Sequence, residues 1–261
     1  MSSIYISAAH KSSGKTTLSI GLARVLVERG VALQPFKKGP DYIDPLWLRA
    51  ASGRPCINLD FYTQSRDEIA ASFSQHMQAQ EMALIEGNKG LYDGLDLDGG
   101  NSNAAMAVFL GAPVVLVINC RGMTRGIAPL LQGYQAFDQK VRFGGVILNQ
   151  VGGARHERKL REVVEHYTDL PVLGAIQADE RLQIDERHLG LMPSNESDDA
   201  EKIICSLAQT VQQNIDVDRL IQISSTAGSV ELAPSPQNTP YSVASEAVRI
   251  GYARDRAFGF Y

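Results

Sequence analysis

The segment of residues 7–17 reads SAAHKSSGKTT and ends in a Gly-Lys-Thr triplet. A short β-branched and aromatic run at residues 4–6 precedes it, and helical apolar spacing follows it over residues 18–27. In a loop of small residues between a strand and a helix, backbone N–H groups point at phosphate oxygens, and the helix N-terminus adds partial positive charge. Lys15 would reach the β- and γ-phosphates, and the Thr16 hydroxyl would bind Mg²⁺. The segment therefore predicts a nucleoside triphosphate site.

The first position of this phosphate loop departs from the usual pattern, because Ala9 stands where a glycine is typical. Alanine adopts a positive φ poorly, so we expect the loop to differ slightly at Ala9. The alternative interpretation is a Gly-Lys-Thr triplet in an ordinary helix cap. The order of strand, loop and helix favours the phosphate loop.

Carboxylates follow two further predicted strands. Asp41 and Asp44 lie in GPDYIDP, and loops after parallel strands meet at the sheet edge where ligands bind. Either side chain could face the nucleotide, or both could be turn residues beside prolines. Glu86 ends the buried run MALIE, a place where phosphate-loop proteins carry an acid that binds Mg²⁺. The alternative is that Glu86 only caps the following turn.

A glycine-rich loop at residues 87–94 follows Glu86, and its glycines let backbone approach a ligand closely. Asp93 is a further candidate carboxylate, and Lys89 is a cation suited to a substrate that carries carboxylates. Basic residues stand in the same predicted loops, although surface solvation explains some of them: Lys37, Lys38, Arg54, Lys89, Arg121 and Arg125. In a chain of net charge -4, cations gathered near one edge predict an anionic ligand there.

The composition is that of an ordinary globular protein, with 44% hydrophobic and 21% charged residues among 261. The negative net charge argues against general nucleic-acid binding. The longest apolar stretch, residues 104–118, is interrupted by glycine and proline and is too short to span a bilayer. No signal peptide is visible, and the three scattered cysteines form no metal or disulfide pattern: Cys56, Cys120 and Cys205. We therefore expect a cytoplasmic protein without a membrane or nucleic-acid partner.

Apolar runs alternate with helical patterns along the chain. Strands are predicted at residues 4–8, 32–36, 82–86, 114–119, 145–149 and 172–175, and helices at 15–29, 66–78, 104–110, 126–137, 157–166 and 199–213. Strands with continuous Val, Ile and Leu are typical of sheets covered on both faces. The alternation predicts an α/β phosphate-loop NTPase fold, with a mostly parallel sheet, helices on both faces and right-handed crossovers.

The pattern changes near residue 223. Residues 224–247 are rich in Ser, Pro and other linker residues, and a fresh strand is predicted from residue 248. We therefore expect a domain at 1–223, a linker at 224–247 and the start of a second domain at 248–261. The alternative is that the last strand joins the edge of the main sheet.

Taken together, these loops resemble the cobyrinic acid a,c-diamide synthase family. Its members are glutamine-dependent amidases of tetrapyrrole side chains, with an ATP-binding domain related to dethiobiotin synthetase. The matching stretches are QPFKKGPDYIDP at 34–45, GRPCINLD at 53–60, IEGNKGLYDG at 85–94, GAPVVLVI at 111–118, GVILNQV at 145–151 and LGLMPSNE at 189–196. HKSSGKTT and QPFKKGPDYIDPLW are similar to members from sulfur-oxidising bacteria that amidate sirohaem. Cobyrinate, hydrogenobyrinate and a nickel-sirohydrochlorin are the alternative substrates, since all present neighbouring acetate groups on one macrocycle edge.

The resemblance implies that ATP and Mg²⁺ are cofactors, and that a tetrapyrrole polycarboxylate and ammonia or glutamine are partners. It implies metal ligands at Thr16, Asp41 and Glu86, and catalytic roles for Lys15, Asp41, Glu86 and Asp93. The implied nucleotide contacts are His10, Lys11, Ser12, Ser13, Gly14, Lys15, Thr16, Thr17 and Asn149. The implied substrate contacts are Lys38, Tyr42, Ile43, Lys89, Tyr92 and Arg121.

The implied reaction transfers a phosphoryl group from ATP to a substrate carboxylate, and ammonia then displaces phosphate from the acyl phosphate. Catalysis would depend mainly on positioning and on neutralising the phosphoryl charge. The tail at 248–261 is similar to the first strand of the family's glutaminase domain. None of the three cysteines lies in a nucleophile elbow, so we expect no glutamine hydrolysis by this chain. The sequence leaves open whether a separate glutaminase supplies the ammonia.

A regulatory or partitioning ATPase of the same superfamily is the alternative function. Such proteins carry an additional lysine near the start of the phosphate loop that reaches across a dimer. Here His10 stands at that position and Lys11 follows one residue later, which favours the ligase. Relatives in this superfamily often pair, so a homodimer is expected.

Overall fold

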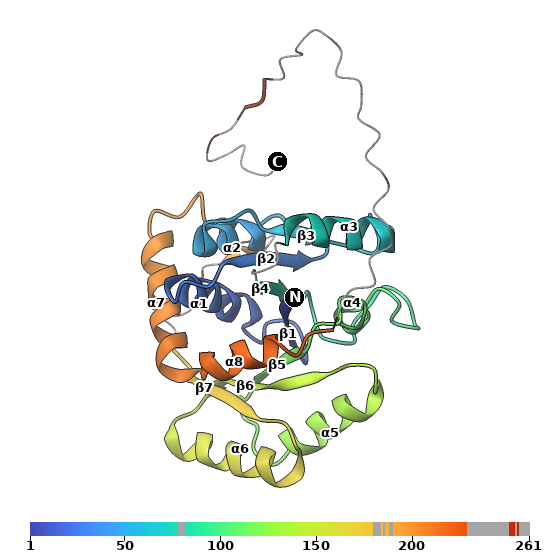
Figure 1. Cartoon of the computed structure of the whole chain (residues 1–261). Helices are drawn as coiled ribbons and strands as arrows, with labels where there is room; N and C mark the ends of the chain where they lie inside the picture. The colour runs from blue at the N-terminus through green and yellow to red at the C-terminus, as the bar shows by residue number, and fades with distance from the viewer. Residues whose placement is uncertain are drawn as a thin grey trace.

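A seven-stranded parallel sheet forms the centre of the computed structural model, which describes residues 1–77, 82–179, 184, 186–187, 190–228, 251–253 and 255. The strands lie in the order β3-β2-β4-β1-β5-β6-β7, and every neighbouring pair is parallel (Figure 1). Their bounds are β1 Ser2–Ala8, β2 Leu33–Lys38, β3 Ile57–Leu59, β4 Met82–Glu86, β5 Val114–Asn119, β6 Phe143–Val151 and β7 Val172–Gln177. The predicted parallel α/β fold is confirmed.

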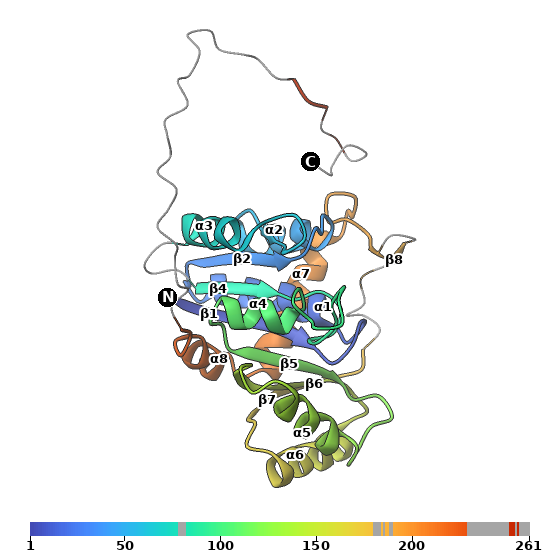
Figure 2. The same cartoon turned by 90° about the vertical axis from the view of Figure 1, so that its right-hand side faces the viewer.

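Helices cover both faces of this sheet (Figure 2). The helices α1, α2, α7 and α8 contribute to one buried apolar cluster, and α3, α4, α5 and α6 contribute to the other. Strand β1 alternates between the two, since Ile4 and Ile6 belong to the first cluster and Tyr5 to the second. The helix bounds are α1 Lys15–Glu28, α2 Asp44–Ser52, α3 Arg66–His76, α4 Asn103–Phe109, α5 Ile127–Phe137, α6 Ala154–Tyr167, α7 Ala200–Asn214 and α8 Val217–Ser224.

Helix α2 was not predicted, and it matters for the site because its first residue is Asp44. Pro45 has no backbone N–H, but it fits at the start of the helix because N–H groups there have no acceptor within the helix. Gly53 ends the helix in the left-handed conformation at φ 73. Trp47 and Leu48 are fully buried and fix its inner face. The short strand β3, the helix α8 and a two-stranded hairpin, β8 Glu186–Arg187 with β9 Gly190–Leu191, were also not predicted.

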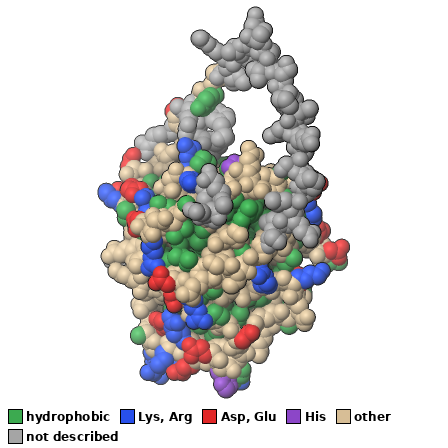
Figure 3. Space-filling view, in the orientation of Figure 1, with side chains coloured by type: hydrophobic (Ala, Val, Ile, Leu, Met, Phe, Trp, Pro, Cys, Tyr) green, Lys and Arg blue, Asp and Glu red, His purple; other side chains and the backbone are tan. Residues whose placement is uncertain are grey.

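Because all seven strands run in one direction, their carboxyl ends meet at one edge of the sheet. The loops after β1, β2 and β4 therefore converge, as do those after β6 and β7. On the face drawn in Figure 3, acidic and basic side chains are interspersed. No helix within the described ranges is long and apolar enough to cross a membrane.

Helix α8 extends to Ser224, one residue past the expected domain boundary. The predicted linker at 224–247 lies outside the described residues from 229 onward, and the predicted strand at 248–261 is described only at 251–253 and 255. Gln78, the last residue of a predicted helix, also lies outside them. Both the linker and the terminal domain remain predictions.

Candidate nucleotide and metal site

The phosphate loop connects the end of β1 to the first residue of α1. Left-handed backbone occurs at Ser12, with φ 61, and at Gly14, with φ 88. Ala9 is not among the described residues with positive φ, so alanine fits at that position without the backbone strain that the sequence suggested. The Ala9 carbonyl instead accepts a hydrogen bond of 2.7 Å from the Tyr134 hydroxyl on α5.

Side chains from inside and outside the loop hold it in shape. The Ser13 hydroxyl donates to the His10 carbonyl at 2.8 Å, and Asn149 at the end of β6 donates to the Ser13 carbonyl at 2.9 Å. A Cβ built on Gly14 would lie 2.1 Å from the Asn149 amide nitrogen. Gly14 is therefore required both for its φ and for the close approach of Asn149.

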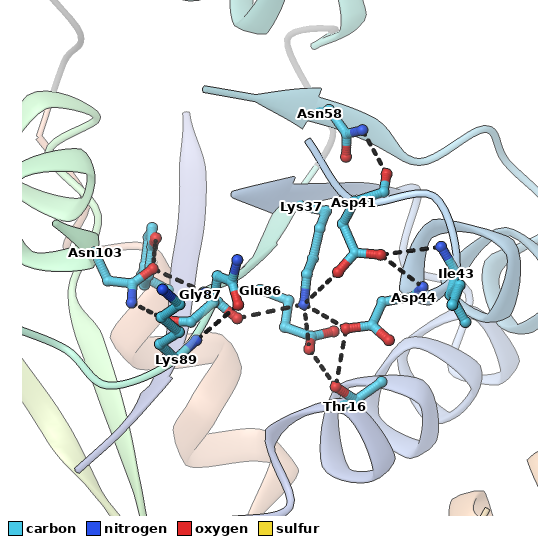
Figure 4. Close-up of polar contacts among 12 residues, drawn as sticks. Thr16, Lys37, Asp41, Ile43, Asp44, Asn58, Glu86, Gly87, Lys89 and Asn103 are labelled. Carbon is cyan, nitrogen blue, oxygen red and sulfur yellow. Dashed lines mark hydrogen bonds and ion pairs between the residues drawn. The ribbon is translucent and has the colours of Figure 1, made fainter. Parts of the chain in front are cut away.

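A polar cluster of Thr16, Lys37, Asp41, Asp44 and Glu86 lies beside the start of α1 (Figure 4). The Thr16 hydroxyl oxygen is 2.6 Å from Glu86 Oε1 and 3.2 Å from Asp44 Oδ2. The Lys37 ammonium donates to Asp44 Oδ2 at 2.6 Å and to Glu86 Oε1 at 2.8 Å. It lies farther, at 3.8 Å, from Asp41 Oδ2. Four elements, α1, β2, α2 and β4, and the turn that carries Asp41 thus bring their polar groups to one point.

Burial and the neighbouring charges shift the pKa values of this cluster. Burial alone would lower the pKa of Lys37, but the carboxylates of Glu86, Asp44 and Asp41 outweigh it and raise that pKa above its ordinary value. Burial raises the pKa of Glu86, although the Lys37 ammonium opposes the shift. Within the described residues, the buried Glu86 Oε2 has no hydrogen-bond partner. An unpartnered carboxylate oxygen at such a point is a candidate ligand for a cation or its bound water.

The structure brings Asp44, and not Asp41, next to Thr16. Asp41 Oδ1 accepts from the backbone N–H groups of Ile43 at 3.0 Å and of Asp44 at 3.1 Å, so it shapes the turn that starts α2. The Asp41 carbonyl accepts from the Asn58 side chain at 2.6 Å, which ties this turn to β3. Asp41 Oδ1 therefore helps to place Asp44, while Asp41 Oδ2 lies 3.8 Å from the Lys37 ammonium. The metal contact that the resemblance implied for Asp41 stays a prediction.

The loop at residues 87–90 is built around the buried side chain of Asn103. That amide accepts from the Tyr5 hydroxyl and the Asn88 N–H, each at 2.9 Å, and it donates to the carbonyls of Gly90, at 2.6 Å, and Asn88. Lys89 adopts a left-handed φ of 44, a conformation that needs such support in a residue other than glycine. Neither Tyr5 nor Asn103 was singled out as a site residue from the sequence, since Tyr5 lies inside a predicted strand and Asn103 just before a predicted helix.

A cavity of about 870 Å³ extends from the phosphate loop along the edge of the sheet. One end has charged and polar lining and includes Lys15, Asp44, Lys89 and Arg121. Burial lowers the pKa of Lys15 to about 8, which Glu86 partly opposes. The other end is largely apolar and is lined by Ile176, Ile184, Leu191, Leu207 and Val211.

The predicted site residues divide between this cavity and its surroundings. Among the described residues, those in its wall are Lys11, Ser12, Gly14, Lys15, Thr16, Thr17, Asp41, Ile43, Lys89, Arg121 and Asn149. His10, Ser13, Lys38, Tyr42, Glu86, Tyr92 and Asp93 are not in the wall. Glu86 is fully buried beneath it, and Tyr42 is about half exposed.

Two of the predicted site residues outside the wall take part in local structure. Asp93 Oδ2 accepts from the Gly90 N–H at 2.9 Å and closes its own turn. The Tyr92 hydroxyl donates to the Tyr134 carbonyl at 2.6 Å, and its ring lies against Tyr134 and Phe137. Both side chains are nevertheless close to the phosphate loop: the negative charge of Asp93 opposes the lowering of the Lys15 pKa, and Tyr92 contacts Tyr134, whose hydroxyl donates to the Ala9 carbonyl. Their catalytic and substrate-binding roles stay predictions.

The chain is similar in sequence to a known family and to curated proteins. Residues 5–192 match the family described as CobQ/CobB/MinD/ParA nucleotide binding domain. The chain is 45% identical to a cobyrinate a,c-diamide synthase of Magnetococcus marinus, over 99% of this chain and 56% of that protein. It is 43% identical to the synthase of Methanosarcina acetivorans, over 99% and 54%, and 36% identical to that of Listeria monocytogenes, over 100% and 58%.

These matches bear out the resemblance seen in the sequence motifs. The chain spans a little more than half the length of these relatives. The matched region includes the phosphate loop, the carboxylate cluster and most of the cavity wall. The chain therefore belongs to the CobQ/CobB/MinD/ParA nucleotide binding domain family.

Proposed function

We propose that this chain binds MgATP and uses it to activate acetate side chains of a tetrapyrrole for amide formation. The observation that carries the proposal is the convergence of Thr16, Asp44 and Glu86 beside a phosphate loop at the charged end of one cavity. The names of the relatives support the amidation of a tetrapyrrole. Because those relatives are longer, the reaction of the whole protein is part of the proposal.

The oxygen atoms of Thr16, Asp44 and Glu86 suit Mg²⁺, which prefers hard oxygen ligands and shares them with phosphate and water. The unpartnered Glu86 Oε2 supports this fit. When bound, the metal would neutralise charge on the β- and γ-phosphates. Asp41 would act indirectly, because it holds the turn that presents Asp44.

Different parts of the cavity would bind different parts of the nucleotide. The N-terminus of α1 and the Lys15 ammonium would bind the β- and γ-phosphates. The apolar end, near Leu207 and Val211 on α7, would accept the base. Asn149 would hold the phosphate loop in position beneath the phosphates through its hydrogen bond to the Ser13 carbonyl.

The residues at the charged end would orient the acceptor carboxylate. In the reaction, a carboxylate oxygen of the substrate attacks the γ-phosphorus, and the bond to the bridging oxygen of ADP breaks. Ammonia then attacks the acyl carbon and loses a proton, and inorganic phosphate leaves. Lys89 and Arg121 line the cavity where they would neutralise the acetate, and Lys38 lies just beyond its wall.

The acceptor is best tested with two macrocycles. Cobyrinate is the first, because of the names of the relatives, and sirohaem is the second, because of the motifs HKSSGKTT and QPFKKGPDYIDPLW. Each would be incubated with the chain, MgATP and ammonium and analysed by mass spectrometry. We expect the mass change of hydroxyl replaced by amino at each converted acetate, with stoichiometric ADP.

A Lys15→Ala variant is the control, and it should form neither amide nor ADP. ATP hydrolysis that needs no polyacid, and that DNA, membrane or a protein partner stimulates, would instead favour a regulatory or partitioning ATPase. Amide formation with glutamine in place of ammonium would show that ammonia does not need a separate source.

A further inference from the structure

The ammonium of Lys37 lies among the oxygens that the proposed metal needs. Its Nζ is 2.6 Å from Asp44 Oδ2 and 2.8 Å from Glu86 Oε1, the same two atoms that lie closest to the Thr16 hydroxyl (Figure 4). The side chain is only 2% exposed, and Glu86 is fully buried. Lys37 is thus an internal counter-ion for the carboxylates of the site.

The backbone fixes this arrangement. Lys37 on β2 and Glu86 on β4 are direct partners in the parallel register of neighbouring strands. Side chains at paired positions of adjacent strands point to the same face, so the two groups must meet. Asp44 at the start of helix α2 accepts a further hydrogen bond from the Lys37 ammonium. The contact does not depend on one flexible surface rotamer.

An ammonium and a divalent cation compete for these oxygens. Mg²⁺ requires oxygen atoms at about 2.0–2.1 Å, whereas the ammonium holds the same atoms at hydrogen-bond distance. A metal ion that arrives alone must also meet the repulsion of a buried positive charge. A metal ion that arrives on a triphosphate brings further oxygen ligands and a compensating negative charge.

We propose that Lys37 prevents free divalent metal from binding to the carboxylate cluster, so that metal enters the site only together with a nucleotide. The proposal rests on the assignment of Thr16, Asp44 and Glu86 as metal ligands in the proposed function. Lys37 would then have two roles, to position the carboxylates and to exclude free metal ions. Neither role follows from its location in a buried strand alone.

The test measures Mn²⁺ binding to the full chain by electron paramagnetic resonance of the free ion, with and without a non-hydrolysable ATP analogue. The variants are Lys37→Met and the matched control Lys38→Met, which removes the same charge from the adjacent residue of β2. We expect Lys37→Met to bind Mn²⁺ without nucleotide at least tenfold more tightly than the wild type. The Lys38→Met variant should bind Mn²⁺ as the wild type does, with and without the analogue; amide formation is not the readout, because Lys38 is a proposed substrate contact.

The outcomes separate the two proposals. If all proteins bind Mn²⁺ with the analogue, but Lys37→Met gains nothing without it, the role of Lys37 is overturned and the metal site stands. If the wild type binds no Mn²⁺ even with the analogue, the metal assignment fails, and the role of Lys37 fails with it.

Should Lys37→Met fold poorly, the wild type alone still decides. Mn²⁺ binding that is as tight without the analogue as with it would refute the proposal. Recovery of the folded Lys37→Met protein by Mn²⁺ alone would support it.

Discussion

Replacing Asp44 and Asp41 separately by asparagine distinguishes the carboxylate that contacts the metal from the one that shapes the turn. Asp44→Asn removes a charge from an oxygen 3.2 Å from the Thr16 hydroxyl. Loss of a charge-assisted contact costs about 2 kcal/mol, which corresponds to roughly 30-fold in affinity. Asp41→Asn keeps an oxygen that can accept from the Ile43 and Asp44 N–H groups. Its lost ion pair with Lys37 is long, at 3.8 Å, so we expect a change of about threefold or less.

The assay is the Mg²⁺ concentration that half-saturates the binding of a fluorescent ATP analogue. Melting temperatures of both variants serve as the control, since a misfolded protein would also bind weakly. An Asp41→Asn protein that needs as much additional Mg²⁺ as Asp44→Asn would refute the assignment of Asp44. An Asp44→Asn protein with wild-type Mg²⁺ dependence would refute it equally.

Three further predictions concern the loop and its supports. Because burial lowers the pKa of Lys15 to about 8 and phosphates bind its protonated form, nucleotide affinity should be flat below pH 8 and fall about tenfold per pH unit above it. Calorimetric titration would measure nucleotide affinity as a function of pH. The same fall of affinity above pH 8 in a Lys15→Arg variant would show that deprotonation of Lys15 is not its cause. Gly14→Ala should lose at least tenfold in nucleotide affinity, because a residue with a Cβ is strained at φ 88 and the added methyl group would displace the Asn149 amide that holds the loop; wild-type affinity would refute that. Asn103→Asp should lower the free energy of unfolding by about 1–3 kcal/mol, because its carboxylate would face the Gly90 carbonyl without a donor, as urea denaturation can measure. An unchanged urea midpoint would show that the amide donor is dispensable.

Much of the fold could be predicted because its strongest signals are local. The central strands are continuous apolar runs, and the phosphate loop is a contiguous motif between a strand and a helix. Helix α2 escaped prediction because it is only 9 residues long and begins in a stretch with two prolines and two acids, which reads as a turn.

The site was less predictable because its contacts cross between strands. Sequence order could not distinguish Asp41 from Asp44. The choice depends on which carboxylate accepts from the backbone of the turn before α2 and which one contacts the Lys37 ammonium at short distance. Lys37 read as one of several loop cations, although strand pairing sets it opposite Glu86, 49 positions later. The four hydrogen bonds of Asn103 likewise depend on a loop that folds back over α4.

The place of β4 in the sheet has a consequence for how the protein acquires its ligand site. Strand β4 lies between β1 and β2, although it is synthesised after both. In the folded sheet, β1 and β2 do not pair with each other but each pairs with β4, so the order β2-β4-β1 is complete only once residues 82–86 have been placed. Glu86 enters with that insertion, so a nascent chain that has not yet placed β4 has no complete site. We expect nucleotide to stabilise only molecules in which β4 has joined β1 and β2, so ligand binding would report that β4 is in place.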